Sequence, residues 1–264
     1  MKRYISVFIM DVSSSSSKDN WNQITDYLQE WEHVINSWCD HIITARVSHR
    51  RGDEILFVGD HCFSAYTIAH YISLFWKFAE QRPYFGLSYG AVSENIDRLD
   101  IEVWNHPLIK QARAQNEKIK RDRDRKITMR FAGESDLHFL ASTADVLNPF
   151  IENQLVLQQS QSENQRLVYA LYSIFNEQKI IARLLNKTPS TISSHFTRGR
   201  SELLQKNFLQ VQKLLGLEEG AGVQDYNRIP LLIHDLNDAI RVQLKKSMPL
   251  LPLFNNKEQI KKGK

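Results

Sequence analysis

Cysteine is scarce in this chain, which has only Cys39 and Cys62 among its 264 residues. Two thiols cannot make a disulfide framework or a cysteine-rich zinc site, and we expect both to be buried in a protein of the reducing cytoplasm. Long hydrophobic runs are also missing. No apolar stretch has the length of a membrane-spanning helix, and the apolar run of residues 5–10 stops at Asp11, too early for a secretory signal. The sequence predicts a soluble cytoplasmic protein without a membrane partner.

A strong charge of one sign is lacking, and so are several catalytic motifs. The net charge is only +4, which neither demands nor excludes a nucleic-acid partner. There is no GxSxG nucleophile motif, no phosphate-binding loop of the GxxxxGKS type and no GxGxxG motif. No two histidines have HxxxH spacing, so we expect His61, His70 and His106 on the surface or as helix caps rather than as metal ligands.

Hydrophobic residues make up 42 % of the chain, which is enough for a sizeable core and, at this length, for two domains. β-Branched and aromatic runs predict four strands, with helical periodicity between them. The strands are expected at residues 4–10, 42–49, 54–59 and 84–92, and the helices at residues 21–38 and 61–81. This order predicts an α+β fold with a split-βαβ, ferredoxin-like sheet that carries helices on one face. Gly86 and Gly90, inside the last strand, indicate close approach of another backbone or of a ligand.

The second half of the chain has a helical pattern. A third helix is expected over residues 103–120, an edge strand over 127–131, and further helices over 136–149 and 229–244. The polar segment 158–163, QQSQSE, has no apolar pattern and predicts a linker. We therefore place a boundary near residue 155, between a sheet domain of residues 1–155 and an all-helical domain of residues 156–250. Residues 251–264 are expected to form a flexible basic tail.

Residues 178–196 have the spacing of two short helices packed across a tight turn. Residues 181–185 carry an apolar stripe at helical spacing. Asn186 tolerates the left-handed conformation of a turn, and Thr188 before Pro189 is a typical helix start. The pattern predicts a helix-turn-helix, although an ordinary helical hairpin would share the same stripe.

The second helix of this motif, at about residues 189–200, directs Ile192 and Phe196 into the core and leaves short polar or cationic side chains outside. A recognition helix in the major groove of double-stranded DNA needs that kind of face. We predict DNA binding by the helix-turn-helix of residues 178–200. The predicted DNA-binding residues are Ser190, Thr191, Ser193, Ser194, His195, Arg198 and Arg200.

Carboxylates lie at the ends of neighbouring strands in the predicted sheet. Asp11 ends the first strand, and Asp53 with Glu54 follows Gly52 in the hairpin between the second and third strands. Asp11 and Asp53 can therefore converge, and two carboxylates near phosphate oxygens favour Mg²⁺. The alternative is that Asp11 only ends a strand and Asp53 is a turn residue. We hypothesise a ligand site at Asp11, Asp53 and Glu54, with Asp11 and Asp53 as the metal ligands.

The segment RGDEILFV, with Asp11 on the first strand, resembles the hairpin of GGDEF and class III nucleotide cyclases. The order of motifs over residues 4–200 resembles the bacterial SatD-like family more closely. The shared features are the acidic end of the first strand, a serine-containing loop, the GDE hairpin, the segment FGLSYGAV, the pair Ala112-Arg113 and a C-terminal helix-turn-helix. The resemblance implies a nucleotide-cyclase-like N-terminal domain whose hairpin and first-strand carboxylates hold metal and nucleotide.

The hairpin also departs from the cyclase pattern. GGDEF enzymes have two glycines before the acidic pair, whereas here Arg51 precedes Gly52. A bulky cation at that place argues against the same catalysis, so we expect the domain to bind a ligand or partner rather than to turn over a substrate. The basic run of residues 110–130 is expected to be a solvated helix face with internal ion pairs rather than a phosphate-binding surface.

Two interpretations of the whole chain follow. In the first, a transcriptional regulator without a cofactor binds double-stranded DNA as a homodimer, through residues 229–244 or a helix of the sheet domain, and the sheet domain senses a ligand. In the second, the chain is a Mg²⁺-dependent nucleotide-binding or nucleotide-processing enzyme that uses Asp11 and Asp53. A protein-binding module is a third, less specific option.

Overall fold

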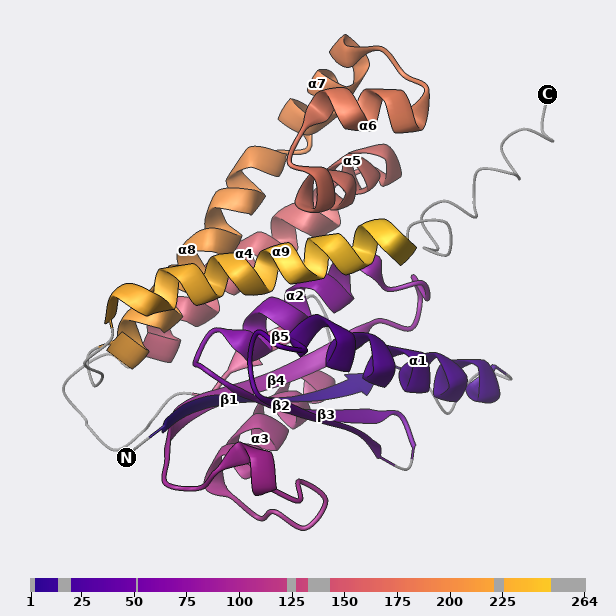
Figure 1. Cartoon of the computed structure of the whole chain (residues 1–264). Helices are drawn as coiled ribbons and strands as arrows, with labels where there is room; N and C mark the ends of the chain where they lie inside the picture. The colour runs from indigo at the N-terminus through magenta and orange to yellow at the C-terminus, as the bar shows by residue number, and fades with distance from the viewer. Residues whose placement is uncertain are drawn as a thin grey trace.

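The structure is a computed structural model that describes residues 3–13, 20–50, 52–122, 127–132, 143–220 and 226–247. Figure 1 shows a sheet with helices packed on it, and a group of short helices that stands away from the sheet. The strands are β1 (Arg3–Val12), β2 (Ala45–Arg50), β3 (Glu54–Asp60), β4 (Pro83–Val92) and β5 (Met129–Phe131). The α-helices are α1 (Trp21–Cys39), α2 (Ser64–Phe75), α3 (Pro107–Arg121), α4 (Thr143–Ser160), α5 (Glu163–Phe175), α6 (Gln178–Leu185), α7 (Pro189–Arg198), α8 (Ser201–Gly220) and α9 (Ile229–Ser247).

The five strands form one mixed sheet in the order β2-β3-β1-β4-β5. The pairs β2-β3, β3-β1 and β1-β4 are antiparallel, and β5 runs parallel to β4. The α+β class predicted from the sequence is confirmed. Each of the five predicted strands is present, with ends that differ by a few residues from those expected.

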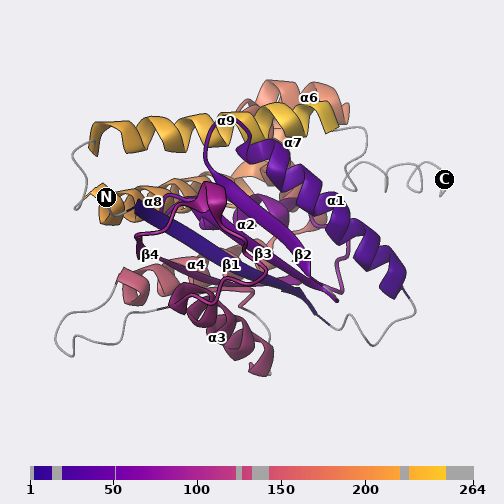
Figure 2. The same cartoon turned by 60° about the horizontal axis from the view of Figure 1, so that its bottom comes forward.

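β1 is the central strand and is buried on both faces. Phe8 and Met10 belong to the core under α1 and α2, whereas Ile5, Val7 and Ile9 belong to a second core under α3. The alternation follows from the period of two in a strand. Figure 2 shows the resulting layers, with α3 on one side of the sheet and α1 and α2 on the other. The prediction of helices on one face only is therefore wrong, because α3 covers the second apolar face.

Helices from the second half of the chain form a further layer over α1 and α2. Leu155 of α4, Phe208 of α8 and Ile240 of α9 lie in the same hydrophobic core as the α2 residues Ile68 and Ile72. The boundary that we place near residue 155 therefore falls inside α4. No helix in the described part of the chain is long and apolar enough to cross a membrane.

Several predicted element boundaries are wrong. The helix predicted over residues 103–120 begins only at Pro107, and the helix predicted to end at residue 149 continues through Pro149 to Ser160. The helix predicted over residues 61–81 ends at Phe75, because Trp76 is extended and its indole N–H donates to the Gln81 carbonyl, 2.7 Å away, across a turn. The linker predicted at residues 158–163 is mostly helical, because α4 continues to Ser160 and α5 begins at Glu163. Ser162 between them caps α5 in a reciprocal capping box with Gln165. Polar residues at a helix start look like a linker when only apolar periodicity is considered.

The histidine prediction is correct for His106 and wrong for His70. His106 caps α3 by accepting from the Leu108 N–H, as predicted. The prediction for His70 is wrong, because this residue of α2 is 4 % exposed and its ring stacks on Phe208. Both cysteines are buried, as expected. The predicted tail of residues 251–264, Arg51 and residues 136–142 of a predicted helix lie outside the described residues.

Candidate nucleic-acid interface

α5, α6 and α7 form a small three-helix group with its own hydrophobic cluster. Ile181 and Ala182 of α6, Ile192 and Phe196 of α7, and Leu171 of α5 are buried against one another. The apolar stripe that the sequence places on residues 181–185 is thus the contact between α6 and its neighbours. α5 also contributes to the main core, so the group is attached to the rest of the molecule through this helix.

The turn between α6 and α7 is made by residues with a specific conformational role. Asn186 is left-handed, with φ 50° and ψ 49°, and its N–H donates back into the last turn of α6. Thr188 is extended, and its hydroxyl accepts from the Thr191 N–H at 3.2 Å. Pro189 occupies the first turn of α7, where a missing N–H costs nothing. All three roles agree with the sequence prediction.

α7 presents a polar surface opposite its buried side. Ile192 and Phe196 are buried, whereas Ser190, Ser193 and Ser194 are exposed. Successive helical residues are about 100° apart, so these three serines share the outward face with a residue that the sequence analysis missed. That residue is the exposed Thr197, which the same helical periodicity would have identified.

Two of the predicted DNA-binding residues lie elsewhere on α7. Thr191 and His195 are half-buried and face α5 rather than the centre of the outward surface. Arg198, at the end of α7, and Arg200, in the following turn, are both exposed. The structure therefore brings five of the seven predicted residues to the open surface and places the other two at its side.

The joint between α7 and α8 is closely packed. A Cβ atom at Gly199 would lie 2.8 Å from the His195 carbonyl oxygen, so only glycine fits. The Gln161 amide donates to the Gly199 carbonyl at 2.5 Å, and Arg200 has a positive φ of 52°. This geometry fixes the direction in which α8 leaves the three-helix group.

The three-helix group is more cationic than the whole chain. Between residues 164 and 200 there are six lysines and arginines and a single acid, Glu177. Five of the cations are exposed on or beside α6 and α7, and Arg166 is exposed on α5. A phosphate backbone is attracted to such a surface.

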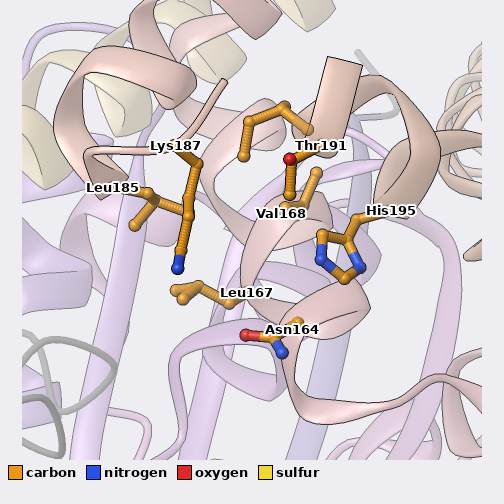
Figure 3. Close-up of a pocket in the computed structure, with 8 residues that line it drawn as sticks. Asn164, Leu167, Val168, Leu185, Lys187, Thr191 and His195 are labelled. Atoms are coloured by element: carbon orange, nitrogen blue, oxygen red, sulfur yellow. The ribbon is translucent and has the colours of Figure 1, made fainter. Parts of the chain in front are cut away.

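A small hollow lies between α5, α6 and α7, beside the outward face. Figure 3 shows the side chains of Asn164, Lys187, Thr191 and His195 around it, with Leu167 among the apolar residues that line it. Its volume is about 130 Å³. Among the described residues, no carboxylate lines it.

The predicted carboxylate site lies where β1 ends and β3 begins. Because Met10 pairs with Ile55, Asp11 and Glu54 occupy opposite positions on β1 and β3, both on the side that α3 covers. Basic residues of α3 neutralise them. Lys120 Nζ lies 2.6 Å from Asp11 Oδ2, and Arg113 donates two hydrogen bonds to Glu54, at 2.6 and 2.8 Å.

Burial and neighbouring charges oppose each other at Asp11. Burial raises the pKa of its carboxyl to about 6, and Lys120 acts in the opposite direction. The negative charges of Asp53 and Glu54 raise the pKa of Asp11 further. Among the described residues, no group of three or more His, Cys, Asp or Glu side chains is arranged to hold a metal ion. A two-carboxylate Mg²⁺ site stays a prediction.

Cations of the basic run of residues 110–130 form ion pairs in the structure. Lys120 reaches Glu117 as well as Asp11, at 3.3 Å. In the described part of this run, cations therefore hold α3 to the sheet and pair along the helix.

Comparison of the chain with models of known protein families, with curated proteins and with solved structures finds no match in any of the three. The resemblance to the SatD-like family thus stays a prediction that rests on the motifs alone.

Proposed function

We propose that this protein is a cytoplasmic transcriptional regulator that binds double-stranded DNA through α6 and α7. In this proposal α6, the turn of residues 186–188 and α7 form a helix-turn-helix, and α7 enters the major groove. The observation that carries the proposal is the outward face of α7: three serines and a threonine over a buried apolar side, with Arg198 at its edge. Short hydrogen-bonding side chains reach base edges, and arginines beside them reach phosphates.

The proposal also assigns a role to the rest of the chain. The strand order β2-β3-β1-β4, with β1 and β3 antiparallel, supports a ferredoxin-like sheet domain. We propose that this domain senses a ligand and that two copies of the chain read two half-sites, since one helix contacts too few bases for useful specificity. α9 already buries Leu236, Ile240 and Leu244 in the core of its own chain. That face is therefore closed to a second copy.

Alanine variants of α7 test the proposal. Ser193→Ala with Ser194→Ala is expected to reduce the preference for a selected duplex over a random one, by about 1–3 kcal/mol for each base contact that is lost. Arg198→Ala is expected to weaken binding to both duplexes alike and to reduce the slope of log K against log salt by about one. Binding of each variant is measured at two salt concentrations, after selection of a duplex from a random pool.

Two exposed residues of other helices supply matched controls. Ser37→Ala on α1 removes an exposed serine, and Lys118→Ala on α3 removes an exposed cation, both away from α7. Both are expected to bind like wild type. Circular dichroism confirms the fold of every variant. Wild-type affinity and preference in the folded α7 variants would mean that α6 and α7 are only a helical hairpin.

A second candidate function is favoured by the strand register, which places Asp11 opposite Glu54, the residue that follows Asp53. In this alternative the sheet domain binds a nucleotide with Mg²⁺ at Asp11 and Asp53. A bound cation would stabilise the folded state, and the free energy of unfolding would rise with the logarithm of the cation concentration once this exceeds the dissociation constant. An increase in the unfolding midpoint with Mg²⁺ that is lost in Asp11→Asn supports this candidate, and equal midpoints with and without Mg²⁺ argue against it.

A further inference from the structure

The hollow between α5, α6 and α7 combines donors at its rim with an apolar floor. Lys187 comes from the turn before α7, His195 from α7 itself, and Asn164 from the first turn of α5. Leu167, Val168, Leu185 and Ile192 make up the floor. Figure 3 shows the polar side chains arranged around the opening from different elements. They are thus positioned by three separate parts of the backbone.

The rim groups have unused hydrogen-bonding capacity. Among the described residues, the Lys187 ammonium, the His195 ring and the Asn164 amide make no hydrogen bond or ion pair with another side chain or with the backbone. A lysine offers three N–H donors, an imidazole at least one and an amide two. With one cation and no carboxylate in the lining, the hollow favours an anion.

The shape of the lining restricts the anion further. A planar carboxylate presents two oxygens, whereas a phosphate group presents oxygens in several directions and so suits donors that approach from different elements. The volume of about 130 Å³ corresponds to roughly four water molecules at about 30 Å³ each. A phosphate alone would leave the apolar floor uncovered, but a phosphate with attached sugar or alkyl carbons would cover it.

We propose that this hollow binds a phosphate ester, with the phosphate at Lys187, His195 and Asn164 and the ester carbons on the apolar floor. The ester has two sources. It is either a DNA backbone phosphate with its deoxyribose, which flanks α7 if the proposed function holds, or a free phosphate ester of similar size. Thr191 and His195 then act beside the DNA-facing surface rather than on base edges.

The first arm of the test uses a free ester. Methyl signals of Leu167, Val168 and Ile192 are followed by NMR during titration with 2-deoxyribose 5-phosphate, with 2-deoxyribose as the uncharged probe. We expect saturable shifts with the phosphate only. Lys187→Ala and Asn164→Ala should weaken binding about tenfold or more, which is about 1.4 kcal/mol or more. Lys179→Ala, which removes an exposed cation of α6 outside the hollow, should leave it unchanged.

The second arm uses duplex DNA and the same variants. If a backbone phosphate occupies the hollow, Lys187→Ala reduces the salt slope by about one and Lys179→Ala reduces it less. Methyl shifts without this slope change identify a free ester as the ligand, and the slope change identifies the DNA backbone. If the wild-type protein binds duplex but shows neither the methyl shifts nor the slope change, the inference is overturned and the proposed function still stands. Methyl shifts in a protein that binds no duplex support the hollow and refute the regulator.

Discussion

Asp11 is a residue whose surroundings act on it in opposite directions. Its carboxyl is buried under α3 and pairs with Lys120, yet burial and the nearby Asp53 and Glu54 raise its pKa to about 6. A carboxyl with a raised pKa holds its proton more tightly in the folded than in the unfolded state. The free energy of unfolding must therefore fall as the pH rises from about 4 to about 6, and it stays lower above that range.

Asp11→Asn is expected to remove this pH dependence. A shift of about two pKa units corresponds to a free energy on the order of 3 kcal/mol. Relative to wild type, the variant should gain stability by up to that amount between pH 4 and pH 7, as measured by urea unfolding at several pH values. Asp26→Asn, at an exposed position of α1, is the control. Parallel pH profiles for Asp11→Asn and wild type would show that Asp11 carries no such cost.

At the scale of elements, the parts predicted correctly are those with a strong local signal. The three-to-four spacing along α1 is obeyed because this helix has one buried face. β1 is buried on both faces, and its continuous run of β-branched and aromatic residues is the signal that predicted it. The turn at Asn186 and Thr188 was predictable because its residue types have few alternatives. The end of α2 at Phe75 was not, since it depends on the hydrogen bond of Trp76 rather than on an apolar pattern.

At Gly86, the close packing of β4 against α3 leaves no space for a Cβ atom. A Cβ atom there would overlap the Ala112 carbonyl oxygen and lie 2.5 Å from the Asn116 nitrogen, both backbone atoms of α3. The close backbone approach predicted from the sequence is confirmed at this position. At Gly90 the nearest atom is Leu108 Cδ2, 3.3 Å away, which belongs to a flexible side chain.

Alanine at these two glycines should therefore have unequal effects. Gly86→Ala must displace α3 from the sheet and is expected to cost about 3 kcal/mol or more, at the upper end of overpacking. Gly90→Ala requires only a small shift of Leu108 and should cost about 1 kcal/mol or less. Urea unfolding of both variants measures the difference. An equal loss of unfolding free energy in both variants would mean that α3 can move away from the sheet at little cost. The close contact between Gly86 and Ala112 would then not determine the residue at position 86.

At the scale of the whole molecule, buried polar groups join α2 to the helices of the second half. Gln154 of α4 hydrogen-bonds His70 and accepts from Tyr66, and Tyr169 of α5 reaches the other ring nitrogen of His70. Burial lowers the pKa of His70 to about 3, so the ring is neutral. A second series of hydrogen bonds between side chains runs from Tyr71 through Asn237 and Gln212 to Thr67.

These contacts could not be predicted from the sequence, because they join residues far apart in the chain. The sequence pattern identifies a polar residue such as Gln212 on α8 but does not show which distant partner satisfies it. The same limit applies to the hollow beside α7, since α5 and α7 form it together. It also applies to the ion pair of Lys120, because its partner Asp11 lies far away in the sequence, near the start of the chain.

The shared core leads to a prediction about cooperativity. All five tryptophans lie at or before residue 104, so their fluorescence reports on the sheet part, whereas circular dichroism at 222 nm also reports on α4 to α9. Phe208 of α8 stacks on His70 and contacts Tyr66, so Phe208→Ala should cost about 3–5 kcal/mol. Because one core connects both parts, we expect coincident urea transitions in wild type, and in the variant both should move to lower urea together. Two independent domains would give a fluorescence midpoint that stays at its wild-type value while the helical signal is lost early.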